Sequence, residues 1–202
     1  MYRPISLTSN VIKIFEKIIK REVTSYLENN NLLNNFQHGF RKHRSCLTEL
    51  IDYYNYILSS ILEKNNNVDV IYLDFSKAFD KVDHQILLRK ARNLGIGGKV
   101  IKWLEEFLTN RRQSVIVDGV KSNPTRVISG VPQGTVLGPL LFIIMINDIC
   151  INIQSEIFSF ADDTRVLRSI HSTTDNTTLQ TDLNTIYNYA LTNNLTFNEN
   201  KF

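Results

Sequence analysis

The feature that most constrains the fold is the segment FSFADDTRVL (158–167), in which two apolar, β-prone runs are separated by Asp162 and Asp163. Aspartate suits tight turns, so the simplest interpretation is a β-hairpin whose turn holds two carboxylates for structural reasons alone. The alternative interpretation is that the turn presents both carboxylates to a ligand. A motif this short does not decide between the two.

A second apolar strand also ends in a carboxylate. The segment VDVIYLDF (68–75) reaches Asp74, and two strands that end in this way can bring Asp74, Asp162 and Asp163 to one point. Like charges at such a point repel one another, so either a proton or a cation must compensate. Carboxylates without nearby His or Cys favour Mg²⁺ or Mn²⁺ over Zn²⁺. Two such ions about 3.5–4 Å apart are the arrangement used for in-line phosphoryl displacement.

A third segment, SGVPQGTVLGP (129–139), surrounds Gln133 with residues of special backbone behaviour. These residues are Gly130, Pro132, Gly134 and Gly138. Glycine allows close approach of another backbone or of a flat base. The segment is therefore either an ordinary loop before a helix that starts at Pro139, or a surface on which a base pair rests.

Composition sets broad limits on the class of protein. Of the 202 residues, 43% are hydrophobic and 21% are charged, as in an ordinary globular protein with a sizeable core. The net charge of +3 is compatible with binding to nucleic acid. It is smaller than the strongly positive charge typical of a dedicated nucleic-acid-binding domain. Cys46 and Cys150 form no CxxC pair and are expected to be buried thiols. We expect an intracellular protein, nuclear or cytoplasmic or both, that is neither secreted nor inserted in a membrane.

Hydrophobic spacing predicts an α+β chain in which long helices alternate with antiparallel hairpins. Thr8-Ser9 and Asp83 are expected to cap helices, and a hairpin is expected to turn near Asp118-Gly119. The expected helices are one from residue 11 to the Asn29–Asn31 cluster and those at about 47–62, 83–94, 99–108, 139–149 and 177–191. The expected strands lie within 68–75, 114–128 and 157–170.

Taken in order, segments along the whole chain resemble the conserved blocks of reverse transcriptases from non-LTR retrotransposons of the jockey or LINE kind. These segments are YRPISLTSNVIKIFEKII, QHGFRKHRS, YLDFSKAFDKVDH, SGVPQGTVLGPLLF, FADD and LTFNENKF. The resemblance implies RNA-directed DNA synthesis in retrotransposition, with an RNA template, a DNA primer and dNTPs as partners. The alternatives are a catalytically inactive truncated remnant and a group II intron-type reverse transcriptase.

The resemblance also implies a fold: a right-hand polymerase palm, which is an antiparallel sheet backed by helices, with partial fingers and no thumb. Residues 1–67 and 96–129 are expected to be fingers-like, and residues 68–95 and 130–202 palm-like. We expect the chain to be a fragment that folds around its palm and polymerises poorly by itself.

For the acidic residues, the resemblance implies a role in binding two Mg²⁺ ions, with Mn²⁺ as a possible substitute. Asp74 and Asp162 resemble the carboxylates that bridge both ions, and Asp163 resembles a third ligand. The carbonyl of Phe75 resembles a backbone ligand. Lys201 resembles the lysine that protonates the leaving pyrophosphate, although a frayed surface lysine is the alternative.

Other residues resemble contacts to the nucleotide. Phe79 resembles the aromatic side chain beneath the incoming sugar, with plain core packing as the alternative. Gln133 and Gly134 resemble residues beside the nucleotide and the template base. Arg3 resembles the arginine that grips the triphosphate, with a solvated surface charge as the alternative.

The basic loop HGFRKHRS (38–45) adds two candidates for binding the template. Arg41 and Arg44 resemble contacts to the template backbone. The alternative is that both are solvated charges of an exposed loop, since phosphate contacts and solvated charges use the same residue types.

Overall fold

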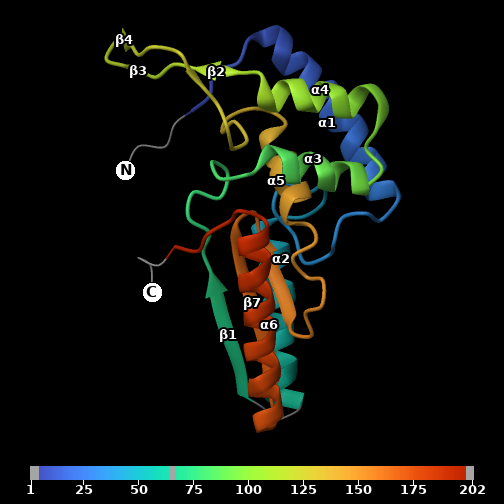
Figure 1. Cartoon of the computed structure of the whole chain (residues 1–202). Coiled ribbons are helices and arrows are strands. Elements are labelled where there is room, and N and C mark those ends of the chain that lie inside the picture. Colours follow the sequence, from blue (N-terminus) through green and yellow to red (C-terminus); the bar gives the residue numbers. More distant parts are fainter. Residues whose placement is uncertain (1–4, 64–66, 199–202) are drawn as a thin grey trace. The chain divides into compact units, whose positions relative to one another are not determined.

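The computed structural model describes residues 5–63 and 67–198. The chain divides into two compact units, each built from two separate stretches of sequence (Figure 1). The first unit comprises Met1–Leu32 and Phe79–Met145, and the second comprises Leu33–Ala78 and Ile146–Phe202. The fingers-like and palm-like ranges expected from the sequence stay a prediction, because the two units reflect contacts within the chain and not function.

The first unit is mainly helical. Its helices are α1 (Asn10–Asn29), α3 (His84–Asn93), α4 (Gly98–Thr109) and α5 (Gly138–Ile146). Helix α5 reads GPLLFIIMI and is apolar on every side, which is typical of a helix buried all round. Buried Lys90 of α3 donates from Nζ to the carbonyl oxygen of Met145 at 2.7 Å, so a cation lies at the C-terminal end of α5, where the helix dipole favours it.

A thin β-ribbon belongs to the same unit. Strand β2 (Arg112–Gln113) pairs with β5 (Thr125–Arg126), and β3 (Ile116–Val117) pairs with β4 (Val120–Lys121). Asp118 and Gly119 both have positive φ, +50° and +79°, as a type I′ turn requires. The hairpin expected at Asp118-Gly119 is therefore confirmed.

The second unit contains a three-stranded antiparallel sheet with β7 (Asp163–Ile170) in the centre. Strand β1 (Asn67–Leu73) lies on one side of β7 and β6 (Glu156–Phe160) on the other. Two residues of β7, Val166 and Leu167, have no exposed surface. Because neighbouring residues of a strand point to opposite faces, both faces of the sheet are covered at this point. The predicted α+β class with an antiparallel sheet is confirmed.

Two helices cover these two faces. Helix α2 (Cys46–Leu58), which continues into a short π-helix, η1 (Ser59–Glu63), meets β7 through Glu49, whose carboxylate accepts from Arg165 at 2.8 Å. Helix α6 (Thr173–Thr192) meets β7 through Asp175, which accepts from Arg168 at 3.0 Å. Arg165 and Arg168 are three positions apart and point to opposite faces. Figure 1 accordingly shows α6 in front of β7 and α2 behind it.

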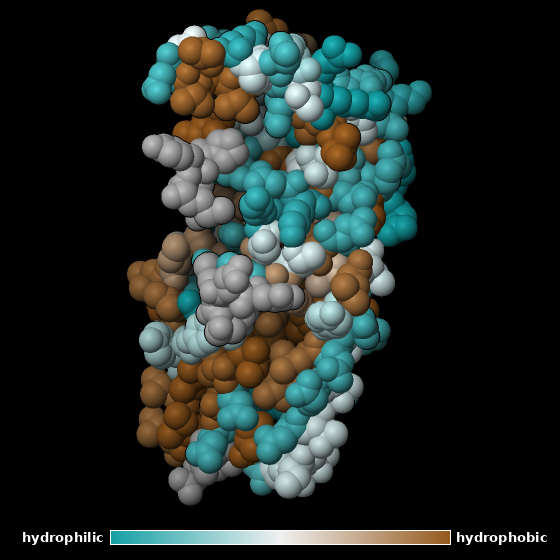
Figure 2. Space-filling model, turned by 60° about the vertical axis from the view of Figure 1, so that its left-hand side comes forward, coloured by the Kyte–Doolittle hydropathy of each residue, from teal (hydrophilic) through white to brown (hydrophobic). Residues whose placement is uncertain are grey.

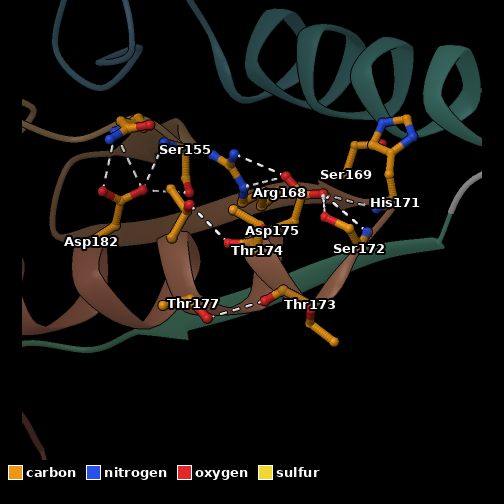
Figure 3. A network of polar contacts seen from close by, with 12 residues as sticks. Ser155, Arg168, Ser169, His171, Ser172, Thr173, Thr174, Asp175, Thr177 and Asp182 are labelled. Carbon is orange, nitrogen blue, oxygen red and sulfur yellow. Dashed lines mark hydrogen bonds and ion pairs between the residues drawn. The ribbon is translucent and has the colours of Figure 1, made fainter.

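The turn from β7 into α6 is fixed by polar contacts (Figure 3). Ser172 and Asp175 form a reciprocal capping box at the start of α6, and Asp175 also accepts from the His171 N–H at 3.1 Å. This N–H, together with Arg168 and Ser172, lowers the pKa of the Asp175 carboxyl group. The contacts hold the end of β7 in line with the first turn of the helix.

The structure corrects two details of the sequence predictions. Helix α5 ends at Ile146 and not near residue 149. The Asn147 carbonyl accepts from the Asn34 side-chain amide at 2.6 Å, and the Asn147 side chain accepts from the Asn34 N–H at 2.9 Å. Asn147 is therefore bonded to a segment distant in sequence at the point where the helix would otherwise continue. The cysteines are less buried than expected: Cys46 is exposed, because it is the first residue of α2, directly after the Ser45 cap, and Cys150 is half-buried.

Apolar side chains also reach the surface of the second unit. They include Leu47, Ile51, Tyr54 and Leu58 of α2 and Tyr72 of β1. Figure 2 shows broad hydrophobic surface, coloured brown, over the lower part of the view, where the elements of this unit lie. Among the described residues, no helix has both the length and the apolar character needed to cross a membrane.

Asp182 of α6 offers a test of the packing in the second unit. It is 1% exposed, and its carboxylate accepts from the N–H groups of Gln154 and Ser155 and from the Ser155 hydroxyl at 2.6 Å (Figure 3). We expect Asp182→Ala to lower the free energy of unfolding by about 2 kcal/mol, because partly buried donors of Gln154 and Ser155 lose a charged acceptor. Urea denaturation measures the change. Asn188→Ala, at an exposed position of the same helix, is the matched control, and equal effects of the two substitutions would contradict the assignment.

Candidate active site

The hairpin formed by β6 and β7 carries two of the predicted carboxylates. Phe160 pairs with Asp163, so Ala161 and Asp162 form a two-residue loop. Ala161 has φ +59°, whereas Asp162 has no positive φ, and this pattern of signs matches a type II′ turn, in which glycine usually holds the first position. A left-handed conformation costs a non-glycine residue about 1–2 kcal/mol. The surroundings of Ala161 must therefore compensate for this strain.

The third carboxylate reaches the same end of the sheet from β1. The register of β1 with β7 ends with Leu73 opposite Thr164. Continuing it by one residue sets Asp74 across from Asp163, and neighbouring strands lie about 4.8 Å apart. Two carboxylates are thus lateral neighbours at the sheet end, and Asp162 lies in the adjoining turn.

Asp74 is also held by a segment from near the C-terminus. The Asn198 side-chain amide donates to Asp74 Oδ2 at 2.8 Å, and the Asn198 N–H donates to the Asp74 carbonyl at 2.9 Å. Phe197 bridges to Phe75, and the rings of these two residues stack with their centroids 4.9 Å apart. The segment 196–198 therefore extends the sheet edge beside Asp74.

The chemistry of these donors fits a hard divalent cation, because they are carboxylates and one is fixed by an amide. Within residues 5–63 and 67–198, however, no group of three or more His, Cys, Asp or Glu side chains is close enough to hold a metal ion. The convergence of Asp74, Asp162 and Asp163 on a shared pair of ions therefore stays a prediction.

The predicted nucleotide contacts lie in the first unit, where the loop containing Gln133 is tied to the segment that follows Ala78. The Val131 N–H donates to the Phe79 carbonyl at 2.8 Å, and the Gln133 side chain donates to Asp80 Oδ1 at 2.9 Å. These contacts join Phe79 and Gln133 into one local assembly.

Two glycines of this loop have left-handed backbones. Gly130 has φ +86°, and a Cβ atom there would lie 2.7 Å from the Asp80 carbonyl oxygen. Gly134 has φ +89° and is exposed. The group that approaches Gly130 closely is another stretch of backbone, which is one of the two kinds of close approach expected for the glycines of this loop.

Phe79 stacks on Phe142, with ring centroids 4.4 Å apart and an angle of 18° between the rings. Phe142 has no exposed surface, whereas Phe79 is partly exposed. One face of the Phe79 ring therefore belongs to the core. The partial exposure leaves both interpretations open, a contact beneath the sugar and plain packing.

The two arginines of the basic loop bind the chain itself. Arg41 donates to the Asn34 carbonyl at 2.6 Å, and Arg44 donates to the Asn35 side chain at 2.8 Å and to the Asn35 carbonyl. Both guanidinium groups therefore help to shape residues 34–45, and template contact stays a prediction. Arg3 and Lys201 lie outside the described residues.

Two residues next to the carboxylates were not singled out from the sequence. Asn198 contacts Asp74, and Gln37 contacts the backbone of Ala161. Both lie within segments that resemble conserved blocks, LTFNENKF and QHGFRKHRS. The resemblance of these segments to conserved blocks was the only sequence signal for the two residues. Their contacts with Asp74 and Ala161 form only when the sheet is folded.

Comparison with known proteins adds independent findings. The family model described as "Reverse transcriptase (RNA-dependent DNA polymerase)" matches residues 1–202. The RNA-directed DNA polymerase from mobile element jockey of Drosophila funebris is 35% identical over 147 residues, covering 73% of this chain and 16% of that protein. Its Drosophila melanogaster counterpart is 34% identical over 174 residues, covering 82% and 19%. The chain thus spans less than a fifth of the length of these curated relatives.

A solved structure agrees with this match at the level of fold. Apo telomerase from Candida tropicalis has a TM-score of 0.69 to this chain, over 94% of this chain and 36% of that one. Sequence identity in this comparison is 12%, so the likeness concerns the fold alone.

His84 offers a test of the loop that holds Gln133. Burial lowers the pKa of His84, as does Arg111, while the Gly130 carbonyl, 2.9 Å from Nε2, and Asp83 oppose this shift. The unfolded chain therefore binds a proton more readily, so the stability from neutral His84 is complete above about pH 6.5 and is lost as the pH falls toward the folded-state pKa. We expect His84→Gln to reduce the loss of unfolding free energy between about pH 7.5 and 5.5.

Urea denaturation at the two pH values measures this difference. His38, whose pKa is also lowered by burial, contributes with the same sign, so the reduction is partial. His43→Gln, at an exposed loop position, is the control. An unchanged pH dependence in His84→Gln would contradict the prediction.

Proposed function

Because the chain belongs to the reverse transcriptase family, we propose that it forms the nucleotidyl-transfer centre of an RNA-directed DNA polymerase from a non-LTR retrotransposon. Its substrates are a DNA primer annealed to an RNA template, and dNTPs. The jockey polymerases of Drosophila, at 34–35% identity, support this choice over other kinds of reverse transcriptase. We propose that it acts inside the cell, in the nucleus, the cytoplasm or both, where template RNA and dNTPs are found.

The observation that carries the proposal is the end of the β1–β7–β6 sheet. The β1–β7 register and the β6–β7 hairpin bring three strand-end carboxylates, Asp74, Asp162 and Asp163, to one edge of the second unit. Acidic side chains at one edge repel one another, and either a proton or a cation can compensate; the compensating cation is what we propose for this edge.

The metal we propose is Mg²⁺, as two ions, with Mn²⁺ as a substitute. Asp74, Asp162, Asp163 and the carbonyl of Phe75 would hold the ions. When bound, the ions would make the primer hydroxyl more acidic and neutralise charge on the departing pyrophosphate. Asn198 keeps Asp74 Oδ2 oriented by donating one hydrogen bond.

In the proposed reaction the primer 3′ hydroxyl releases its proton to solvent, and its oxygen forms a bond to the α-phosphorus of the dNTP. The bond from that phosphorus to the bridging oxygen of the β-phosphate breaks, and pyrophosphate leaves. Gln133 and Gly134 lie beside the nucleotide and the template base in this proposal. Arg41 and Arg44 contact the template backbone while they shape their own loop.

Primer extension tests the function. Because the chain spans less than a fifth of its relatives, residues 1–202 replace the matching segment of the Drosophila funebris jockey polymerase. We expect this hybrid to extend a DNA primer on an RNA template in Mg²⁺, and Asp162→Asn to reduce extension by at least about a thousandfold, as for loss of a principal charge-stabilising group.

Asp69→Asn is the matched control, because Asp69 is exposed in β1 and lies away from the acidic edge. Full extension by Asp162→Asn would contradict the metal assignment. A hybrid that extends no primer, while the parent polymerase does, would contradict the function.

Phe79 offers a test of sugar selection in the same hybrid. If the exposed part of its ring lies under the 2′ position of the nucleotide, the ring leaves no room for a hydroxyl group. We expect Phe79→Val to raise the incorporation of rNTPs relative to dNTPs by at least about tenfold, the scale of losing one steric contact in a pocket. Single-nucleotide addition kinetics with each substrate measure the ratio.

Phe142→Leu is the control, because Phe142 provides the buried half of the stack. It should lower stability without changing the ratio. An unchanged ratio in Phe79→Val would favour the core-packing interpretation.

A further inference from the structure

The side chain of Gln37 is 1% exposed and is bonded to the turn that carries Asp162. Its Nε2 donates to the Ala161 carbonyl at 3.0 Å and to Ser159 Oγ at 3.3 Å. Its Oε1 accepts from the N–H of Ala161 at 2.8 Å and from the N–H of Gly39 at 2.7 Å. A primary amide has two donor and two acceptor positions, so every position is used.

The backbone around Gln37 is fixed to the same hairpin. The His38 N–H donates to the Ser159 carbonyl at 2.8 Å, and the Ser159 N–H donates to the Phe36 carbonyl at 2.9 Å. Residues 36–38 thus form a short parallel pairing along the outer edge of β6. The Gln37 side chain extends from this anchored backbone to the turn.

Gly39 permits this close approach. A Cβ atom at position 39 would lie 2.3 Å from the Ala161 backbone nitrogen and 2.9 Å from its Cα. These distances are far below van der Waals contact, and the obstructing atoms are backbone. The pair Gln37 and Gly39 therefore fits closely around the one residue of the turn that has a left-handed backbone.

We propose that Gln37 is a positioning residue for catalysis, which fixes the direction of the Asp162 carboxylate by holding Ala161 in its left-handed conformation. The inference rests on the proposed function, because it concerns the same metal-binding edge. The Gln37 amide binds both the N–H and the carbonyl of Ala161, and a turn with either group reversed would lose one of these bonds. Without Gln37, alanine favours other turn conformations in which Asp162 points elsewhere.

The interior of the hairpin is suited to this role. Ser159 has no exposed surface, and its Oγ lies 2.9 Å from Thr164 Oγ1 and 3.2 Å from the carbonyl of Asp163. The bonds of Gln37 therefore continue into a buried polar network that joins both strands beneath the turn. Such a network specifies one arrangement, because each lost bond leaves a buried group unsatisfied.

The first experiment measures Mn²⁺ affinity of the chain by electron paramagnetic resonance. Gln37→Met keeps the length of the side chain and removes its hydrogen bonds. We expect it to weaken Mn²⁺ binding by about tenfold, the population change that matches the cost of a left-handed alanine. Gln180→Met, at an exposed position of α6, should bind as the wild type does.

A double-mutant cycle separates positioning from general destabilisation. Glycine adopts the left-handed conformation without strain, so Ala161→Gly should reduce the dependence on Gln37. In the Ala161→Gly background, we expect Gln37→Met to weaken Mn²⁺ binding by less than about threefold. An equal loss in both backgrounds would overturn the proposal.

Amide hydrogen exchange at Ala161 provides a readout that needs no metal. We expect faster exchange at this amide in Gln37→Met, with unchanged exchange in the centre of β7. If Gln37→Met does not fold, Gln37→Glu, which keeps the acceptor and loses the donor, is measured in its place.

The outcomes distinguish this inference from the proposed function. If the wild type binds no Mn²⁺ but hydrogen exchange at Ala161 still depends on Gln37, the metal assignment is wrong. Gln37 then stabilises the turn without a role in catalysis, and the positioning role is overturned. If the wild type binds Mn²⁺, and Gln37→Met or its replacement changes neither affinity nor exchange, the proposed function survives and the inference is wrong.

Discussion

The antiparallel pairing of β1 with β7 determines where the acidic residues of the second unit lie. A slip of one residue in this pairing would turn every side chain of β1 to the opposite face and would separate Asp74 from Asp163. In β1, Val68 and Val70 are half-buried whereas Asp69 between them is exposed, so such a slip would expose the valines and turn Asp69 toward the packed face. The register is thus maintained by apolar packing along the strand, at a distance from the polar end that depends on it.

Two short segments complete that polar end, one at each side. Residues 36–38 pair along the outer edge of β6, and residues 196–198 continue the edge beyond β1. Each segment brings one primary amide. Asn198 donates to the Asp74 carboxylate, and Gln37 binds the backbone of Ala161, the residue before Asp162. Neutral amides can supply hydrogen bonds without adding or cancelling charge, so they orient an acidic edge without competing with cations for it.

Local features of the fold could be predicted from the sequence, because their causes lie within a few residues. The caps at Ser9 and Asp83 bind N–H groups two or three positions away, and the Asp118-Gly119 turn needs only its own two residues. The end of α5 could not be predicted, since Asn34 displaces the helix from 113 positions away. The location of the acidic residues at strand ends could be predicted from the sequence. The contact between Gln37 and Ala161 could not, because it spans 124 positions and forms only in the folded sheet.

The ribbon formed by β3 and β4 has a consequence for handling the protein. Its strands are two residues long, and Ile116, Val117 and Val120 are all more than 60% exposed, so the ribbon extends from its unit as an apolar hairpin with free edges (Figure 1). Unpaired β-edges of this kind favour pairing with other chains, which leads to aggregation at high concentration. Asp118 in the turn and Lys121, which pairs with Ile116 across the ribbon, are the charges that oppose such association. Colloidal stability of the purified chain therefore depends on a peripheral hairpin and on the ionic strength that screens its two charges.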